Sequence, residues 1–172
     1  KVKSLRVSIT QGTGNTQTTL SLEVVQPDKI HLTQKTAQAT NELICLADDP
    51  ATERFQVACY QKALEPFMAR GRELHKLKLS HAAVDSARLA DIKAGRWKMP
   101  ATPTALYNLV ASKDSLDAVS GLAGGKGNRW YVVYIPYATE ATSGFSTTPD
   151  GSGRPWLMYS GEPWAHLMVT PR

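Results

Sequence analysis

Hydrophobic and polar residues alternate over the first third of the chain, which is the pattern of strands that bury one face. Turn-forming residues separate three alternating segments, with Gly12 to Asn15 in the first gap and Pro27-Asp28 in the second. The pattern therefore predicts an antiparallel meander. Its apolar positions are Leu5, Val7, Ile9, Leu20, Leu22, Val24, Ile30 and Leu32.

In the middle third the apolar residues recur at steps of three and four, which is the spacing of a helix with one buried face. Asp49 before Pro50 resembles a helix start, because an aspartate caps free amides and a proline fits the first turn. We expect a helix that begins at Asp49 and is kinked near Pro66. Its buried stripe would comprise Val57, Tyr60, Leu64, Phe67, Gly71 and Leu74.

The remaining segments predict two more helices and a group of C-terminal strands. Ser80 is a suitable N-cap for a helix that ends at Gly95, and Thr102-Pro103 is suited to open another that reaches Val110. Residues 130–135 are apolar on both faces, as in a central strand covered on both sides. Two short strands are expected at 155–159 and 164–169, after a long loop at 137–155 that we expect to be functional or mobile.

Together these elements predict an α+β fold, in which an antiparallel sheet formed by the N-terminal meander and the C-terminal strands is covered by a central block of amphipathic helices. The chain has 172 residues, of which 42% are hydrophobic, and it contains no linker or internal repeat. A chain of this size can bury one substantial core. We therefore expect residues 1–172 to form a single domain.

The net charge of +5 is modest for this length. Between Arg70 and Lys98 there are eight lysines and arginines against three acidic residues, but Trp97 is the only aromatic among them suited to stacking. These charges fall on the outer faces of the predicted helices, so we expect no nucleic-acid partner. No segment approaches the roughly 20 apolar residues of a membrane span, which predicts a soluble chain whose leader peptide, if exported, was removed before Lys1.

Cys45 and Cys59 are too far apart in sequence for a zinc knuckle or a redox C-x-x-C pair. They form either a disulfide or two buried thiols. An even cysteine count in a chain rich in Thr, Ser, Gln and Pro favours the disulfide and a periplasmic or secreted location. The turn at Asp48-Asp49-Pro50 would bring Cys45 alongside Cys59 on the predicted helix.

The sequence contains no assembled catalytic or metal motif. It lacks a nucleophile elbow, and its four histidines show none of the spacings of two-histidine metal motifs. We therefore expect no cofactor, and the balance favours a protein that is not an enzyme.

His166 is the most promising candidate site residue, because it lies in an apolar segment. His166 and Met168 would share one face of a strand, a soft pair suited to Cu(I). A four-residue loop at 160–163 would place Leu157 opposite His166 and turn Met158 to the other face, which favours core packing of the methionines over a metal site. The candidate ligand-binding residues are Trp156, Tyr159, Trp164 and His166.

Three segments resemble the LolA-like periplasmic lipoprotein carriers: VKSLR at 2–6, VVQPDKIHLT at 24–33 and GRWKMP at 95–100. The first two are similar to the opening strands of that superfamily, and the third to a later G-x-W-x-x-P stretch. The resemblance implies a curved antiparallel sheet closed by helices, with acyl chains on its concave apolar face. It assigns no binding residue in this chain.

The leading functional hypothesis is an extracytoplasmic, non-catalytic binding or carrier protein for an apolar or small-molecule ligand. One alternative is a small hydrolase that uses His166 and the loop at 137–155. Another is a structural or interaction module, which would require Trp156, Tyr159 and Trp164 to form an exposed patch.

Overall fold

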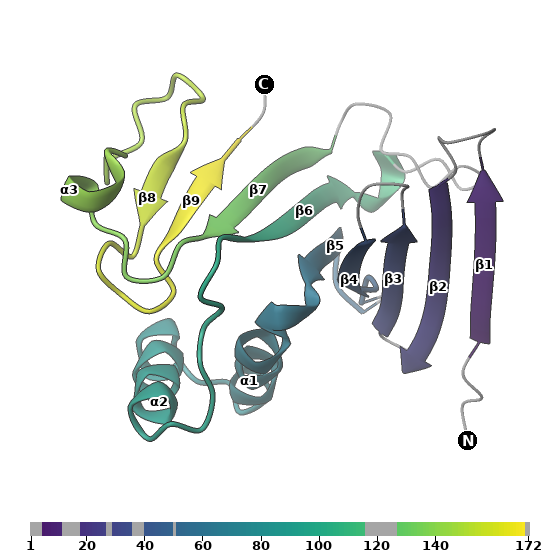
Figure 1. Cartoon of the computed structure of the whole chain (residues 1–172), viewed down its shortest axis with the longest axis horizontal. Helices are drawn as coiled ribbons and strands as arrows, with labels where there is room; N and C mark the ends of the chain where they lie inside the picture. The colour runs from purple at the N-terminus through teal and green to yellow at the C-terminus, as the bar shows by residue number, and fades with distance from the viewer. Residues whose placement is uncertain are drawn as a thin grey trace. The chain divides into compact units, whose positions relative to one another are not determined.

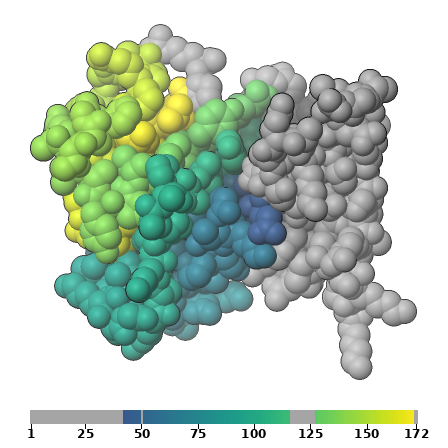
Figure 2. Space-filling view, viewed as in Figure 1, coloured from purple at the N-terminus to yellow at the C-terminus, as the bar shows by residue number. Residues whose placement is uncertain are grey.

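The computed structural model describes residues 5–11, 18–26, 29–35, 40–49, 51–115 and 127–170, and describes side chains from Glu42 onward within these ranges. Figure 1 shows the elements, and Figure 2 draws the described side chains in colour. The fold is α+β, as predicted. The chain divides into two compact units, which we call the N-terminal unit (Lys1–Lys62 with Leu106–Tyr131) and the helical unit (Ala63–Ala105 with Val132–Thr170). Organisation as a single domain stays a prediction.

The N-terminal unit is built on an antiparallel sheet. Its strands are β1 (Leu5–Gln11), β2 (Thr18–Gln26), β3 (Lys29–Lys35), β4 (Thr40–Leu46), β5 (Arg54–Gln61) and β6 (Thr104–Ser112), in that order, followed by the first half of β7 (Asn128–Tyr134). The register places apolar residues opposite one another, as in the pair Leu22 and Leu32. The predicted meander is therefore confirmed, because β1 pairs with β2 and β2 with β3, both antiparallel.

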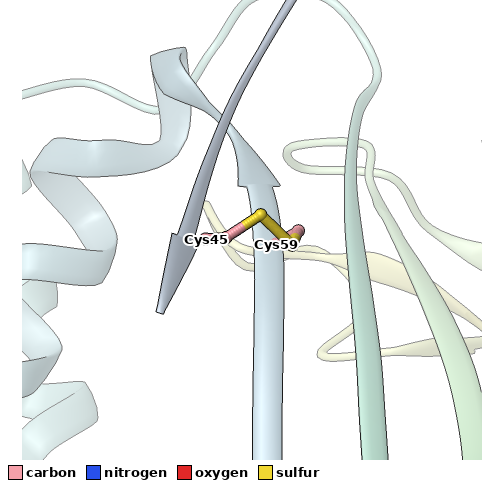
Figure 3. Close-up of a disulfide and its surroundings, with 2 residues drawn as sticks. All are labelled: Cys45 and Cys59. Atoms are coloured by element: carbon pink, nitrogen blue, oxygen red, sulfur yellow. A yellow bond between two sulfur atoms is a disulfide. The ribbon is translucent and has the colours of Figure 1, made fainter. Parts of the chain in front are cut away.

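Cys45 on β4 and Cys59 on β5 form a disulfide with an S–S distance of 2.08 Å (Figure 3). The two residues lie directly opposite each other in the strand register. The predicted disulfide is confirmed, but the secondary structure expected around Cys59 was wrong. Cys59 lies on a strand rather than on a helix, and it meets Cys45 through strand pairing.

The helix predicted to start at Asp49 is a strand over its first part. Buried residues alternate along β5 at Ala58 and Tyr60, and β5 pairs with both β4 and β6. Asp49 instead accepts the amide of Ala51 at 2.9 Å, while Asp48 accepts the amide of Gln56 at 2.8 Å. The two aspartates thus close a turn, and pairing on both edges overrides the helical spacing of the apolar residues.

The helical unit contains α1 (Glu65–Lys76), α2 (His81–Lys93), the end of β7, α3 (Glu140–Ser143), β8 (Trp156–Met158) and β9 (His166–Val169). The strands follow the order β7, β9, β8, and Figure 1 shows α1 beside α2. Pro66 lies in the first turn of α1, where its missing amide costs nothing, so it begins the helix instead of kinking one. Short 3-10 turns occur at Lys62–Leu64 and Lys113–Ser115.

The predicted limits of the second helix are confirmed. The Ser80 hydroxyl accepts the amide of Ala83 at 3.3 Å, and Gly95 adopts a φ of +70° just past the helix end. This is the left-handed conformation that glycine accommodates without strain.

The helix predicted from Thr102-Pro103 to Val110 was wrong. These residues form β6, in which Leu109 lies opposite Val57 of β5. The predicted strand at 130–135 is present as β7, between β6 and β9 in the strand order. Its expected burial on both faces holds only in part, because Tyr131 remains 37% exposed.

Asp91 joins the two long helices of the helical unit. Its side chain on α2 is almost fully buried and accepts a hydrogen bond from Nε of Arg70 on α1 at 2.6 Å. Arg96 also pairs with Asp91, and Arg72 pairs with Glu65 at 2.8 Å. Several cations of the basic segment are thus neutralised locally. Among the described residues, no helix is long and apolar enough to cross a membrane.

Candidate functional site

The ring of Phe67 on α1 is the centre of an aromatic cluster in the helical unit. Its centroid lies 5.8 Å from that of Trp97, 5.7 Å from that of Tyr134 on β7 and 6.2 Å from that of Trp164. The guanidinium carbon of Arg88 on α2 lies 4.0 Å from the Phe67 centroid, a cation–π contact. We call these five residues the Phe67 cluster.

Gly71 on α1 makes room for the Arg88 guanidinium. A β-carbon at position 71 would lie 1.9 Å from a terminal nitrogen of Arg88. Glycine inside a helix costs about 1 kcal/mol relative to alanine. Its presence on the buried face of α1 is therefore explained by the close approach of the arginine.

Arg88 differs from the other arginines in the described part of the helical unit. Each of those is ion-paired: Arg70 with Asp91 and Glu73, Arg72 with Glu65, Arg96 with Asp91, and Arg154 with Asp150. Arg88 forms no ion pair with a described residue, and its one hydrogen bond goes to the Phe67 carbonyl at 3.3 Å. Burial lowers the pKa of Arg88, while Tyr134, Asp85 and Tyr159 nearby act to raise it.

Three buried N–H donors in the Phe67 cluster have no acceptor among the residues that the structure describes. They are Nε of Arg88, Nε1 of Trp97 and Nε1 of Trp164. Each belongs to a residue in contact with the Phe67 ring. A buried donor without a partner costs about 1–3 kcal/mol, so a molecule that brings acceptor atoms to these groups would be stabilised here.

Two tyrosine hydroxyls lie near the Arg88 charge. Burial raises the pKa of Tyr134 to about 12, with Arg88 opposing that rise and Tyr159 adding to it. Tyr134 therefore keeps its proton at neutral pH and can donate a hydrogen bond. Tyr159 is 43% exposed, which makes it the part of this neighbourhood most open to solvent.

His166 lies next to the cluster and is 8% exposed. Its Nδ1 atom is 2.8 Å from the Trp164 carbonyl oxygen, and its ring contacts those of Tyr134 at 5.1 Å and Tyr159 at 5.7 Å. Burial lowers the pKa of His166, although the hydrogen bond to Trp164 opposes that shift. His166 is therefore a neutral imidazole at pH 7. No described hydroxyl or carboxylate is hydrogen-bonded to its ring.

The predicted site residues are brought together only in part. Tyr159 contacts both Trp164, at 6.3 Å, and His166. Trp156 lies apart from these ring contacts and lines a hollow of about 390 Å³ formed with the loop at 144–155. Trp164 is only 4% exposed, so the three aromatics of the interaction-module hypothesis do not form one exposed patch.

The predicted register of the last two strands was wrong. Met158, not Leu157, lies directly opposite His166, and Trp156 lies opposite Met168. The connection runs from 159 to 165, and its left-handed residues are Tyr159 and Gly161, with φ of +53° and +81°. Pro163, which cannot adopt this conformation, is therefore not the residue that turns the chain.

Sequence reasoning missed Arg88, Phe67 and Trp97 as parts of one site. The sequence predicts that Arg88 lies on the solvent-exposed face of its helix, together with its charged neighbours. The available signal was Gly71, a glycine on the buried stripe of a helix, which indicates a close approach by another group.

No known protein family, curated protein or solved structure matches the chain.

Proposed function

We propose that this protein is an extracytoplasmic, non-catalytic binding protein whose ligand is a small organic anion held at Arg88. The observation that supports this most is the half-buried Arg88 guanidinium, which forms no ion pair with a described residue while the neighbouring arginines of its unit do. A planar guanidinium binds a carboxylate through two parallel hydrogen bonds. The unsatisfied indole donors of Trp97 and Trp164 add further groups that an anionic oxygen would accept from.

The surroundings of Arg88 favour a ligand with one negative charge and an apolar body. Arg88 is the single cation in contact with Phe67 in the described part of the cluster, and His166 is neutral at pH 7. A second negative charge on the ligand would find no matching cation. The aromatic rings of the cluster would instead pack against hydrocarbon.

The extracytoplasmic location is supported by the Cys45–Cys59 disulfide, because such bonds persist in oxidising compartments. The hydrolase alternative receives less support, since catalysis would need a hydroxyl or an activated water at the second nitrogen of His166. None of the described hydroxyl groups is hydrogen-bonded there.

We expect 4-phenylbutyrate to bind the wild-type chain and 4-phenylbutan-1-ol, its uncharged counterpart, to bind at least tenfold more weakly. A charge-assisted hydrogen bond contributes about 1.5–3 kcal/mol, which corresponds to roughly 10- to 100-fold in affinity. Arg88→Gln should remove this preference for the anion. Isothermal titration calorimetry measures both affinities. Equal binding of the acid and the alcohol to the wild-type protein would contradict the proposal.

The indole N–H signals locate the binding in the same experiment. In a ¹H–¹⁵N spectrum, the Trp97 and Trp164 indole signals should shift when the acid is added, because their donors gain an acceptor. The Trp130 and Trp156 signals serve as internal references. Arg129→Gln removes the same charge from an exposed position on β7 and should leave binding unchanged.

Gly71→Ala should abolish anion binding without unfolding the protein. The added methyl group would displace the Arg88 guanidinium, which is the end of a flexible side chain and can move aside. The helix itself gains about 1 kcal/mol from replacing glycine by alanine, so circular dichroism should show unchanged helix content. Retained affinity for 4-phenylbutyrate in this variant would show that the position of Arg88 does not matter.

A further inference from the structure

Three side chains suited to soft metal ions share one face of the hairpin formed by β8 and β9. Met158 lies directly opposite His166, and Met168 follows His166 by two positions on the same strand. Opposite residues in a strand pair, and residues two apart on one strand, point to the same side of the sheet. The register therefore brings two thioethers and one imidazole to one surface, and Figure 1 shows the two strands as neighbours.

The spacing of this face suits a single small ion. The β-carbons of directly opposite residues lie about 4.5–5.5 Å apart. Methionine has three rotatable side-chain bonds, which lets its sulfur approach a neighbouring imidazole from either side. Met158 and Met168 are both half-buried, so their side chains retain space to rearrange.

The hydrogen bond of His166 leaves one ring nitrogen available as a ligand. The Trp164 carbonyl can only accept, so Nδ1 of His166, 2.8 Å away, carries the proton. Nε2 then bears the free lone pair. Metal-binding histidines almost always donate their other ring N–H to a carbonyl or a carboxylate in this way, because the bond fixes both the tautomer and the ring orientation.

The ligand types indicate which ion would bind. Thioether sulfur and imidazole favour Cu(I) over hard cations. Both cysteines are held in the disulfide, so no thiolate competes for a soft ion. Among the described residues there is no group of three His, Cys, Asp or Glu side chains that would favour zinc.

We propose that Met158, His166 and Met168 bind one Cu(I) ion. This site shares no ligand with the anion site at Arg88: none of its three side chains belongs to the Phe67 cluster, although the Trp164 carbonyl that orients His166 does. Loss of either site would leave the other testable.

Silver(I) is the probe for this site, because it is a soft cation of the same charge that needs no reductant and so leaves the disulfide intact. The full-length oxidised protein, labelled with ¹³C at the methionine methyl groups, is titrated with silver nitrate in chloride-free buffer. The chain has four methionines, which give four methyl signals. We expect the signals of Met158 and Met168 to shift together until one equivalent is added, while those of Met68 and Met99 stay in place.

Matched variants test each ligand. Met158→Leu and Met168→Leu preserve the side-chain volume, so the hairpin should remain folded, and each should weaken silver binding at least tenfold. His166→Gln should weaken it to a similar degree. Met68→Leu and Met99→Leu remove the same sulfur atom elsewhere in the chain and should have no effect. The proposal is overturned if silver shifts all four methyl signals alike, shifts none of them, or binds Met158→Leu and Met168→Leu as tightly as it binds Met68→Leu.

Discussion

Asp91→Asn should lower the free energy of unfolding by about 3 kcal/mol, because it breaks a buried ion pair while keeping the shape of the side chain. Asp91 is 3% exposed and connects Arg70 on α1 to Arg96 beyond the end of α2. An asparagine has one acceptor oxygen and no charge, so it cannot serve both guanidinium groups equally. Urea denaturation followed by circular dichroism measures the loss.

Glu73→Gln is the matched control for this prediction. Glu73 pairs with the same Arg70 at 3.2 Å, but its side chain is 66% exposed. An exposed ion pair contributes little, so this variant should lose less than about 1 kcal/mol. Similar losses in the two variants would show that burial of Asp91 is not what makes its ion pairs important.

The effect of Asp91→Asn should also depend on pH. Burial by itself would raise the pKa of Asp91, but the hydrogen bonds and charges of Arg70 and Arg96 outweigh it and hold the pKa below its ordinary value. A carboxyl whose pKa is lower in the folded state adds stability above its unfolded pKa of about 3.9 and loses it as the pH falls through the folded value. The difference between wild type and variant should therefore be constant above about pH 5 and shrink below pH 4. A constant difference down to pH 2 would contradict this assignment.

Removing the disulfide by the double substitution Cys45→Ala and Cys59→Ala should destabilise the protein by about 3 kcal/mol. The bond closes a short loop, with a sequence separation of 14, and restricts the unfolded chain more than the folded one. The unfolded variant would expose more surface, so the dependence of the unfolding free energy on urea should steepen as well.

Reduction of the wild-type protein is the control for this result. Its mass should rise by about 2 Da on treatment with a thiol reductant, and its stability should fall to that of the double variant. The reductant should not change the stability of the variant. If the untreated protein already had the higher mass, the disulfide and the proposed extracytoplasmic location would both lose their support.

Local sequence signals predicted the features that depend on a few neighbouring residues. The alternation around Leu22 and Leu32, the N-cap at Ser80 and the helix end at Gly95 all appear where the residue types indicated. Each depends on the geometry of one strand or one helical turn. The disulfide was predicted from the even cysteine count and the composition, whereas the geometry expected for it, with Cys59 on a helix, was wrong.

The predictions of secondary structure were wrong where the spacing of the apolar residues is compatible with both a helix and a strand. Val57, Tyr60 and Leu64 have helical spacing, yet the first two lie on β5, because strands on both sides pair with it. The segment after Pro103 likewise became β6 through pairing with β5. Hydrogen bonds to residues distant in sequence decided both cases, and spacing within one segment carries no information about them.

Only part of the candidate site was predicted from the sequence. The sequence analysis named Trp156, Tyr159, Trp164 and His166 as candidates, and the last three do meet. Arg88 and Phe67 could not be joined to them from sequence, because they come from two helices whose packing brings the guanidinium onto the ring.

The amino-acid sequence was enough to predict the fold class and the ends of α2, and to favour a disulfide between the two cysteines. Those follow from side-chain polarity, backbone preference and composition, which act over a few residues. Long-range contacts were needed to establish that 54–61 and 104–112 are strands, that Met158 lies opposite His166, and that Arg88 is half-buried without an ion pair among the described residues. Each of these depends on contacts between distant segments, whose free energy exceeds the small local preferences that the sequence displays.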